Sequence, residues 1–132
     1  MGRVLLILAA MAMLLAAGGC GGGGIPSSSI SIYNATTDTL ISTAGATGHI
    51  DVPVGGDFQI AVKRLVSGSG GTNTSEVTTV STYHFDVDGI ATANSLGVVH
   101  GVAAGDTTLE VKFQPTVTDP VDRCYLDITV TP

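Results

Sequence analysis

Residues 88–111, which read DGIATANSLGVVHGVAAGDTTLEV, decide the fold, because short runs of strand-forming residues alternate there with glycine turns. Gly97 is predicted to take a positive φ and to turn one strand into the next. Gly101 and Gly105 enclose three small residues, which predicts a crossover between strands. From residue 108 to residue 113 apolar and polar side chains alternate. That period is typical of a strand with one buried face.

The same period of two recurs along most of the chain after Ile30. Turn signals separate the runs, and after residue 20 no window of ten residues carries a helical stripe. Short strands with regular turns over about 100 residues predict an antiparallel β-sandwich. Its expected core is Phe58, Ile60, Val62, Tyr83, Phe85, Leu109, Val111, Phe113, Leu126, Ile128 and Val130. Val77 and Val87 share their parity with Tyr83 and Phe85, which predicts one continuous strand over 77–87.

Residues 88–111 resemble the commonest signature of group 2 bacterial immunoglobulin-like domains, the type found in invasins and intimins. Residues 52–60 (VPVGGDFQI) and 126–131 (LDITVT) are similar to an early strand and the closing strand of that family. The resemblance implies an all-β, immunoglobulin-like antiparallel β-sandwich. The family usually has a core tryptophan, which this chain lacks, so we expect Tyr83 or Phe85 to fill that space.

The first 29 residues predict processing and anchoring rather than folded structure. Arg3 is followed by an apolar run over 4–17, shorter than the roughly 20 residues that span a bilayer, which is typical of a secretory signal peptide. Residues 17–20 (AGGC) resemble the lipobox of bacterial lipoproteins. The resemblance implies cleavage before Cys20, lipidation of its thiol and acylation of the new amino terminus, as by palmitate. An ordinary secreted protein with an incidental Cys20 is the alternative.

Three segments follow from these features. We expect a cleaved signal peptide over 1–19, a lipidated Cys20 with a flexible Gly/Ser linker over 20–29, and the immunoglobulin-like domain over 30–132. Gly21 stands where an Asp retains lipoproteins at the inner membrane of enterobacteria-like cells. That favours the outer membrane or cell surface within the cell envelope.

The charge balance restricts the partners. Five Lys and Arg stand against eleven Asp and Glu, a net charge of −6, and removal of Arg3 with the signal peptide would make it more negative. Nucleic acid binding needs clustered cations, and anionic lipid would repel an acidic surface. We therefore expect no nucleic acid partner, and membrane contact only through the lipid on Cys20. Cys124 alternates with buried positions, so we expect a small buried hydrophobe, with an intermolecular disulfide or reactive thiol left open.

Few residues could carry chemistry. His49, His84 and His100 lie on separate segments without metal-ligand spacing or an evident companion carboxylate. Asp86 and Asp88, followed by Gly89, are the candidate Ca²⁺ ligands, with Asp119 and Asp122 expected in another loop. Two carboxylates are too few for calcium, which takes six to eight oxygens. We expect a structural turn there, no cofactor and no catalytic residues.

These expectations converge on a non-catalytic binding or structural module. It would act as a monomer in adhesion or envelope assembly, with an unknown envelope protein or a glycan as partner. Contact would be made at a sheet edge or a loop end rather than a cleft, and residues 66–75 are expected to form a long mobile loop. The alternatives are a secreted or periplasmic carbohydrate-binding accessory module, a calcium-dependent adhesin fragment and, from another class, an enzyme.

Overall fold

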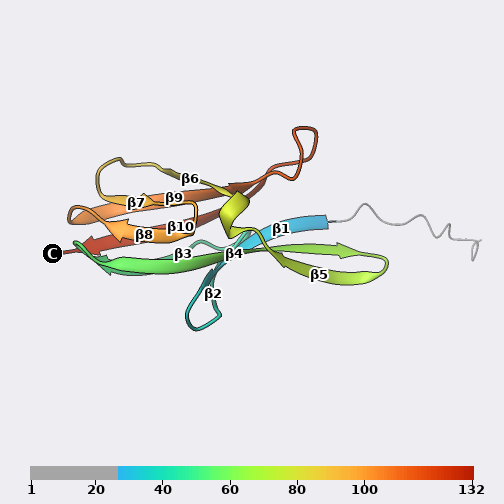
Figure 1. Ribbon diagram of the computed structural model, residues 1–132, viewed down its shortest axis with the longest axis horizontal. Helices are drawn as coiled ribbons and strands as arrows, with labels where there is room; N and C mark the ends of the chain where they lie inside the picture. Colours follow the sequence, from blue (N-terminus) through green and yellow to red (C-terminus); the bar gives the residue numbers. More distant parts are fainter. Residues whose placement is uncertain (1–26) are drawn as a thin grey trace, which may run out of the picture.

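The computed structural model describes residues 27–132, which form two β-sheets packed face to face (Figure 1). The predicted signal peptide, Cys20 and most of the predicted linker lie outside the described residues. Within them η1 (Thr78–Val80), a single 3₁₀ turn, is the one helical element, and no helix there is long and apolar enough to cross a membrane. The all-β, two-sheet prediction is confirmed.

The larger sheet has the strand order β2-β1-β4-β8-β7, with β5 added beside one end of β4. The smaller sheet has the order β3-β10-β9-β6. In the larger sheet the bounds are β1 (Ser27–Asn34), β2 (Thr39–Thr43), β4 (Asp57–Gly68), β5 (Gly71–Glu76), β7 (Ala91–Ala93) and β8 (Val98–Gly101). In the smaller sheet they are β3 (Gly48–Pro53), β6 (Thr82–Phe85), β9 (Gly105–Phe113) and β10 (Asp122–Thr131).

The core between the sheets is aliphatic at its centre. Tyr83 and Phe85, expected to replace a tryptophan, are only partly buried and pack at the margin of the core. Cys124 is fully buried, as predicted, and burial raises the pKa of its thiol. The fully buried side chains are Ile30, Ile32, Ile60, Leu109, Leu126, Ile128, Val52, Val62, Val99, Val111, Val130 and Cys124. Each large aliphatic side chain removed from water contributes about 1.5–3 kcal/mol.

The expectation of a purely antiparallel sandwich is wrong, because β3 pairs with β10 in parallel. The chain leaves the larger sheet after β2 and enters the smaller sheet as β3, alongside the last strand and in the same direction. Ile50 then lies opposite Ile128 in the core. Burial of these apolar side chains stabilises a pairing that local sequence alone does not predict.

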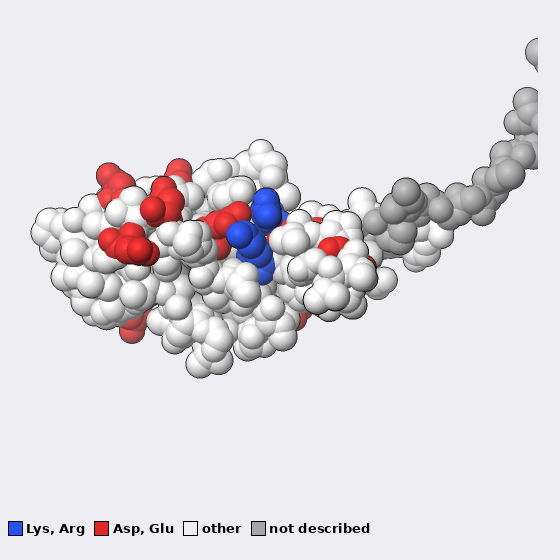
Figure 2. Space-filling view, turned by 90° about the horizontal axis from the view of Figure 1, so that it is seen from above, with Lys and Arg blue, Asp and Glu red and all other residues white. Residues whose placement is uncertain are grey.

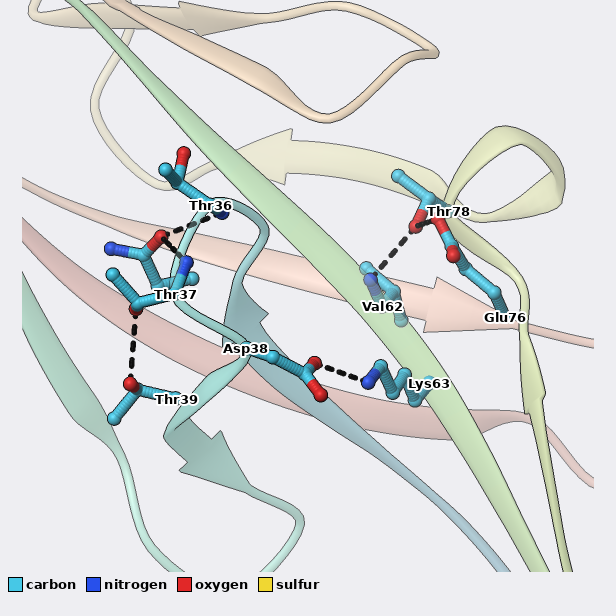
Figure 3. Close-up of polar contacts among 9 residues, drawn as sticks. Thr36, Thr37, Asp38, Thr39, Val62, Lys63, Glu76 and Thr78 are labelled. Atoms are coloured by element: carbon cyan, nitrogen blue, oxygen red, sulfur yellow. Dashed lines mark hydrogen bonds and ion pairs between the residues drawn. The ribbon is translucent and has the colours of Figure 1, made fainter.

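A single strand over 77–87 is also wrong. η1 interrupts it where the chain crosses from β5 to the smaller sheet, and Val87 is exposed. Thr78 holds this crossing in place: its hydroxyl accepts a hydrogen bond from the Val62 amide at 2.9 Å and donates to Glu76 at 3.1 Å (Figure 3). Only Thr82 to Phe85 remain as a strand, β6.

The predicted mobile loop over 66–75 is instead a β-hairpin. β4 and β5 pair from Lys63 opposite Glu76 to Gly68 opposite Gly71, and the hairpin extends past the body of the sandwich (Figure 1). We call residues 63–76 the arm. Small polar residues suffice here, because the strands are joined by backbone hydrogen bonds rather than by burial.

The last three residues of the predicted linker are part of a strand. Ser27, Ser28 and Ser29 already belong to β1 and pair with the arm. The Ser28 hydroxyl donates a hydrogen bond to Asp122, whose carboxylate lies 3.4 Å from Nε of Arg64. Asp122 is therefore the buried first residue of β10, not a loop residue as predicted. It ties the first described strand to the smaller sheet.

Two glycines of the 88–111 stretch are where the predicted turns need them. Gly97 has φ +80°, and a Cβ built there would lie 2.5 Å from the carbonyl oxygen of Ile60. A Cβ on Gly101 would lie 2.4 Å from the carbonyl oxygen of Pro53, where β8 ends and the chain crosses to the other sheet. The predicted positive φ at Gly97 and the crossover after Gly101 are confirmed.

Gly97→Ala is expected to destabilise the domain by about 3 kcal/mol, because a strained left-handed backbone is combined with a steric overlap. Gly89→Ala is the matched control: Gly89 has φ +84° but open space around its Cβ position, so about 1 kcal/mol is expected. Urea unfolding of both variants measures the difference. Equal losses of stability would mean that the close approach to Ile60 costs nothing.

Candidate functional site

The outer face of the smaller sheet gathers most of the polar side chains that could recognise a ligand. Alternation along β3, β9 and β10 turns the apolar side chains inward, so the polar ones must share the outer face. We call this surface the polar sheet face. It comprises His49, Asp51, His84, Asp86, Asp106, Thr108, Glu110, Tyr125, Asp127 and Thr129.

Strand register sets which of these side chains are neighbours. Asp127 on β10 lies between His49 on β3 and Thr108 on β9. Glu110 on β9 lies between Tyr125 on β10 and His84 on β6. Directly opposite Cβ atoms on adjacent strands are about 4.5–5.5 Å apart, so each row forms one continuous contact surface.

Hydrogen bonds orient the carboxylates of this face. Thr108 donates its hydroxyl hydrogen to Asp127 at 2.8 Å, and Thr129 donates to Asp106 at 2.7 Å. The Tyr125 hydroxyl donates to Glu110 at 3.1 Å, which leaves the ring 41% exposed beside a fixed carboxylate. The acceptor oxygens are thus held in place before any ligand arrives.

Two of the carboxylates are more acidic than usual. Asp86 follows β6 and accepts from the Thr108 amide at 2.7 Å and the Thr107 hydroxyl at 2.9 Å, and these bonds lower its pKa. Lys112 lies 2.9 Å from Glu110, and its hydrogen bond, followed by that of Tyr125, lowers the pKa of Glu110. Both groups are therefore charged at neutral pH.

Two adjoining hollows mark the polar sheet face. One, of about 300 Å³, is lined by His49, Asp106, Asp127 and Thr129, among others; the second, of about 310 Å³, is lined by His84, Glu110 and Tyr125. Asp86 and Thr108 line both, so the hollows join. A third hollow, of about 460 Å³, is lined by Lys112, Arg123 and Val121, among others. Figure 2 shows several carboxylates toward one end of the molecule, a few at the other, and the cations near its middle.

The structure corrects the expectation that no histidine has a companion carboxylate. His49 Nε2 lies 3.1 Å from Asp51, and His100 Nδ1 lies 2.6 Å from Asp57 on the outer face of the larger sheet. The two pairs are exposed and lie on different sheets. They do not form one centre with His84, which points outward as predicted.

The predicted calcium candidates are not brought together with further ligands. Asp86 is bound to Thr107 and Thr108, whereas Asp88 lies exposed in the connection after β6. Among residues 27–132 no group of three or more His, Cys, Asp and Glu side chains could hold a metal ion. Asp86 serves instead to fasten the end of β6 to β9.

The sequence reasoning missed Tyr125, Glu110 and Asp127 as members of a site. Alternation along 122–131 places Tyr125 and Asp127 outward, so the signal was present. The sequence does not reveal the strand order β3-β10-β9-β6, and without that order the three side chains cannot be known to be neighbours.

A smaller charged cluster lies on the outer face of the larger sheet (Figure 3). Lys63 on β4 pairs with Asp38, a non-glycine residue with φ +54° in the turn after β1, and its ammonium group lies 4.6 Å from the centre of the Tyr33 ring. The hydrogen bond with Asp38 raises the pKa of Lys63. Because the lysine charge is matched locally, this cluster offers little charge to a partner.

No protein-family model and no curated protein sequence matches this chain.

Acid titration should report the hydrogen bonds of Asp86. A lowered native pKa means that this carboxylate contributes stability above its unfolded pKa, and that the contribution is lost as the pH falls through the native pKa. The stability advantage of the wild type over Asp86→Asn should therefore be constant above about pH 5 and shrink as the pH falls below about 4, measured by urea unfolding. Asp88→Asn, which removes a neighbouring exposed charge, is the control. An equal pH response of both variants would contradict this assignment.

Proposed function

We propose that this chain is a lipid-anchored cell-envelope protein whose immunoglobulin-like domain acts as a non-catalytic binding module. The strand order supports the immunoglobulin-like part. In chain order β1, β4, β7 and β8 correspond to strands A, B, D and E of one sheet, and β6, β9 and β10 to strands C, F and G of the other. The resemblance of residues 88–111 to group 2 bacterial immunoglobulin-like domains agrees with this correspondence.

The anchoring part of the proposal rests on the lipobox-like residues 17–20. Lipidated Cys20 would hold the domain at the envelope, and Gly21 favours the outer membrane or cell surface. β1 starts at Ser27, so a short segment would join the lipid to the first strand. A short segment would keep the domain close to the membrane. Several acyl chains anchor a protein stably, whereas one acyl chain alone would not.

The polar sheet face supports binding rather than catalysis. Its carboxylates are already engaged by threonine and tyrosine hydroxyls, and Asp86 and Glu110, with lowered pKa values, are poorly suited to donate a proton near neutral pH. A preformed array of acceptors needs no such proton transfer to hold a ligand. An enzyme remains the rival class, and a calcium-dependent adhesin would need ligands besides Asp86 and Asp88.

One observation carries the binding proposal: the exposed Tyr125 ring lines one of the two joined hollows, together with the fixed carboxylates of Glu110 and Asp86. Protein partners in adhesion or envelope assembly could use such a surface. The same observation favours a second candidate, a carbohydrate-binding accessory module. An aromatic ring can pack against the apolar face of a sugar while Glu110 and Asp86 accept hydrogen bonds from its hydroxyls.

Cys20→Ser is expected to move the protein from the membrane fraction to the soluble fraction of the producing cell, because the acylated thioether is lost. Fractionation followed by immunoblotting measures the shift, and mass spectrometry of the amino-terminal peptide identifies the modification. Cys124→Ser is the matched control, because Cys124 is buried in the core. An unmodified Cys20 in the mature protein would overturn the anchoring proposal.

Tyr125→Ala should weaken binding to the envelope fraction that the protein recognises by about tenfold, equivalent to about 1.4 kcal/mol. Pull-downs would compare purified envelope polysaccharide with polysaccharide-free envelope protein, which separates the two candidates. Tyr33→Ala on the larger sheet is the control and should bind like the wild type. Binding that is indifferent to Tyr125→Ala would exclude the polar sheet face as the contact surface.

A further inference from the structure

The outer edge of β5 is an exposed strand edge without the features that usually protect one. All six residues of β5 are exposed, and β4 is the strand with which it pairs. From Gly71 to Ser75 it carries no charge and no proline; its one charged residue is the terminal Glu76. Natural sheets guard their edges with charges, prolines, bulges or very short strands. β5 is therefore open to pairing with another strand.

The other described edges are better protected. β3 carries Asp51 and ends at Pro53, and β2 pairs with β1 across a break in register after Ile32. β6 and β7 have four and three residues, which is too short for extensive pairing. Within residues 27–132, β5 thus offers the longest unguarded edge, at the end of the molecule where the described chain begins.

The register shows which backbone groups of β5 face outward. The Val77 amide donates to the Val62 carbonyl at 2.8 Å, beside the first β4–β5 pair. Hydrogen-bonded pairs alternate along an antiparallel ladder, so Ser75 and Asn73 bond inward to β4. Thr72, Thr74 and Glu76 must then direct their N–H and C=O groups to the open side of β5.

We propose that two copies of this chain pair through β5, antiparallel, with Thr74 opposite Thr74 of the second copy. Thr72 of each copy then lies opposite Glu76 of the other, and each such pair exchanges two backbone hydrogen bonds. The contact is isologous and joins the two larger sheets into one. It replaces the monomer expected from the sequence.

Charge is compatible with a second copy as the occupant. The arm holds Lys63 and Arg64, two of the four cations among the described residues, whereas the carboxylates of the polar sheet face lie on the other sheet. In the proposed register Glu76 faces Thr72 of the other copy, so no two carboxylates are directly opposed across the strands. Lys63 lies opposite Glu76 within its own chain.

Anchoring favours the same occupant, and this step rests on the proposed lipidation of Cys20. Ser27 lies opposite Ser67, which lies opposite Thr72, so the chain enters the fold two strands, about 10 Å, from the open edge. Two copies held in one membrane would therefore present their arms at similar heights. Confinement also raises the effective concentration of one edge near the other.

Oxidative cross-linking of Thr74→Cys tests the proposed register. Cα atoms of a directly opposed hydrogen-bonded pair are about 5.5 Å apart, within disulfide range, and a copper–phenanthroline oxidant accepts the electrons of the two thiols. Asn73→Cys is the matched control, because in this register its Cα lies about 8 Å from that of its counterpart, beyond disulfide range. Using the full chain in membranes, we expect several-fold more disulfide dimer from Thr74→Cys. Equal yields from the two variants, or none above the parent chain, would overturn the proposal.

A second variant separates pairing from chance collision. Thr72→Pro, added to Thr74→Cys, removes an N–H that faces the second copy and spares the bonds to β4; the dimer yield should fall several-fold. Thr72→Ala should leave it unchanged, and an unchanged yield with proline would contradict edge pairing. Repeating the comparison of Thr74→Cys with Asn73→Cys in the soluble Cys20→Ser chain tests edge pairing without the anchor, because chance collision would cross-link both variants equally. If the soluble chain still forms the disulfide dimer, edge pairing does not depend on the anchor. If the wild-type protein is also found in the soluble fraction, the anchoring proposal is overturned while the pairing proposal stands.

Discussion

The structure depends on one constraint: every second side chain of the strands that face each other must be apolar, because two sheets share a single core. Leu109, Val111, Leu126 and Ile128 satisfy it completely and exclude water from the centre. The core is aliphatic at that centre, so burial of branched side chains must supply most of its cohesion. Strands that obey this alternation also place their polar side chains together on the outside, and the polar sheet face follows directly.

In segments that lack alternating apolar side chains, backbone hydrogen bonds rather than burial hold the strands together. The arm and the first residues of β1 contain mainly serine, threonine and glycine, yet they form a regular ladder. Their side chains bury little, so this part of the sheet gains less from packing and keeps one edge unpaired. Ser28, Asp122 and Arg64 join the arm to the smaller sheet through a partly buried ion pair. The part of the domain nearest the proposed anchor is thus also the part most available to another strand.

The polar sheet face and the arm differ in how their charged side chains are paired. Lys63, Arg64, Lys112 and Arg123 have carboxylates within ion-pair distance, and three of those pairs involve Glu110 or Asp38 on outer faces. Asp86, Asp106 and Asp127 have threonine hydroxyls as hydrogen-bond partners instead of cations. A ligand of the polar sheet face therefore meets fixed acceptors, whereas the arm is close to electrically balanced.

The sequence alone determined the all-β class, the buried faces of β9 and β10, the burial of Cys124 and the turn at Gly97. These depend on the period of two and on backbone conformations that glycine adopts easily, both of which are local properties. Tertiary structure decided the parallel β3–β10 pair, the interruption at η1, the hairpin over 66–75 and the strand status of Ser27–Ser29. It also brought Tyr125, Glu110 and His84 into one row. Which strands become neighbours depends on burial and pairing between segments far apart in the sequence, so a local pattern does not predict it.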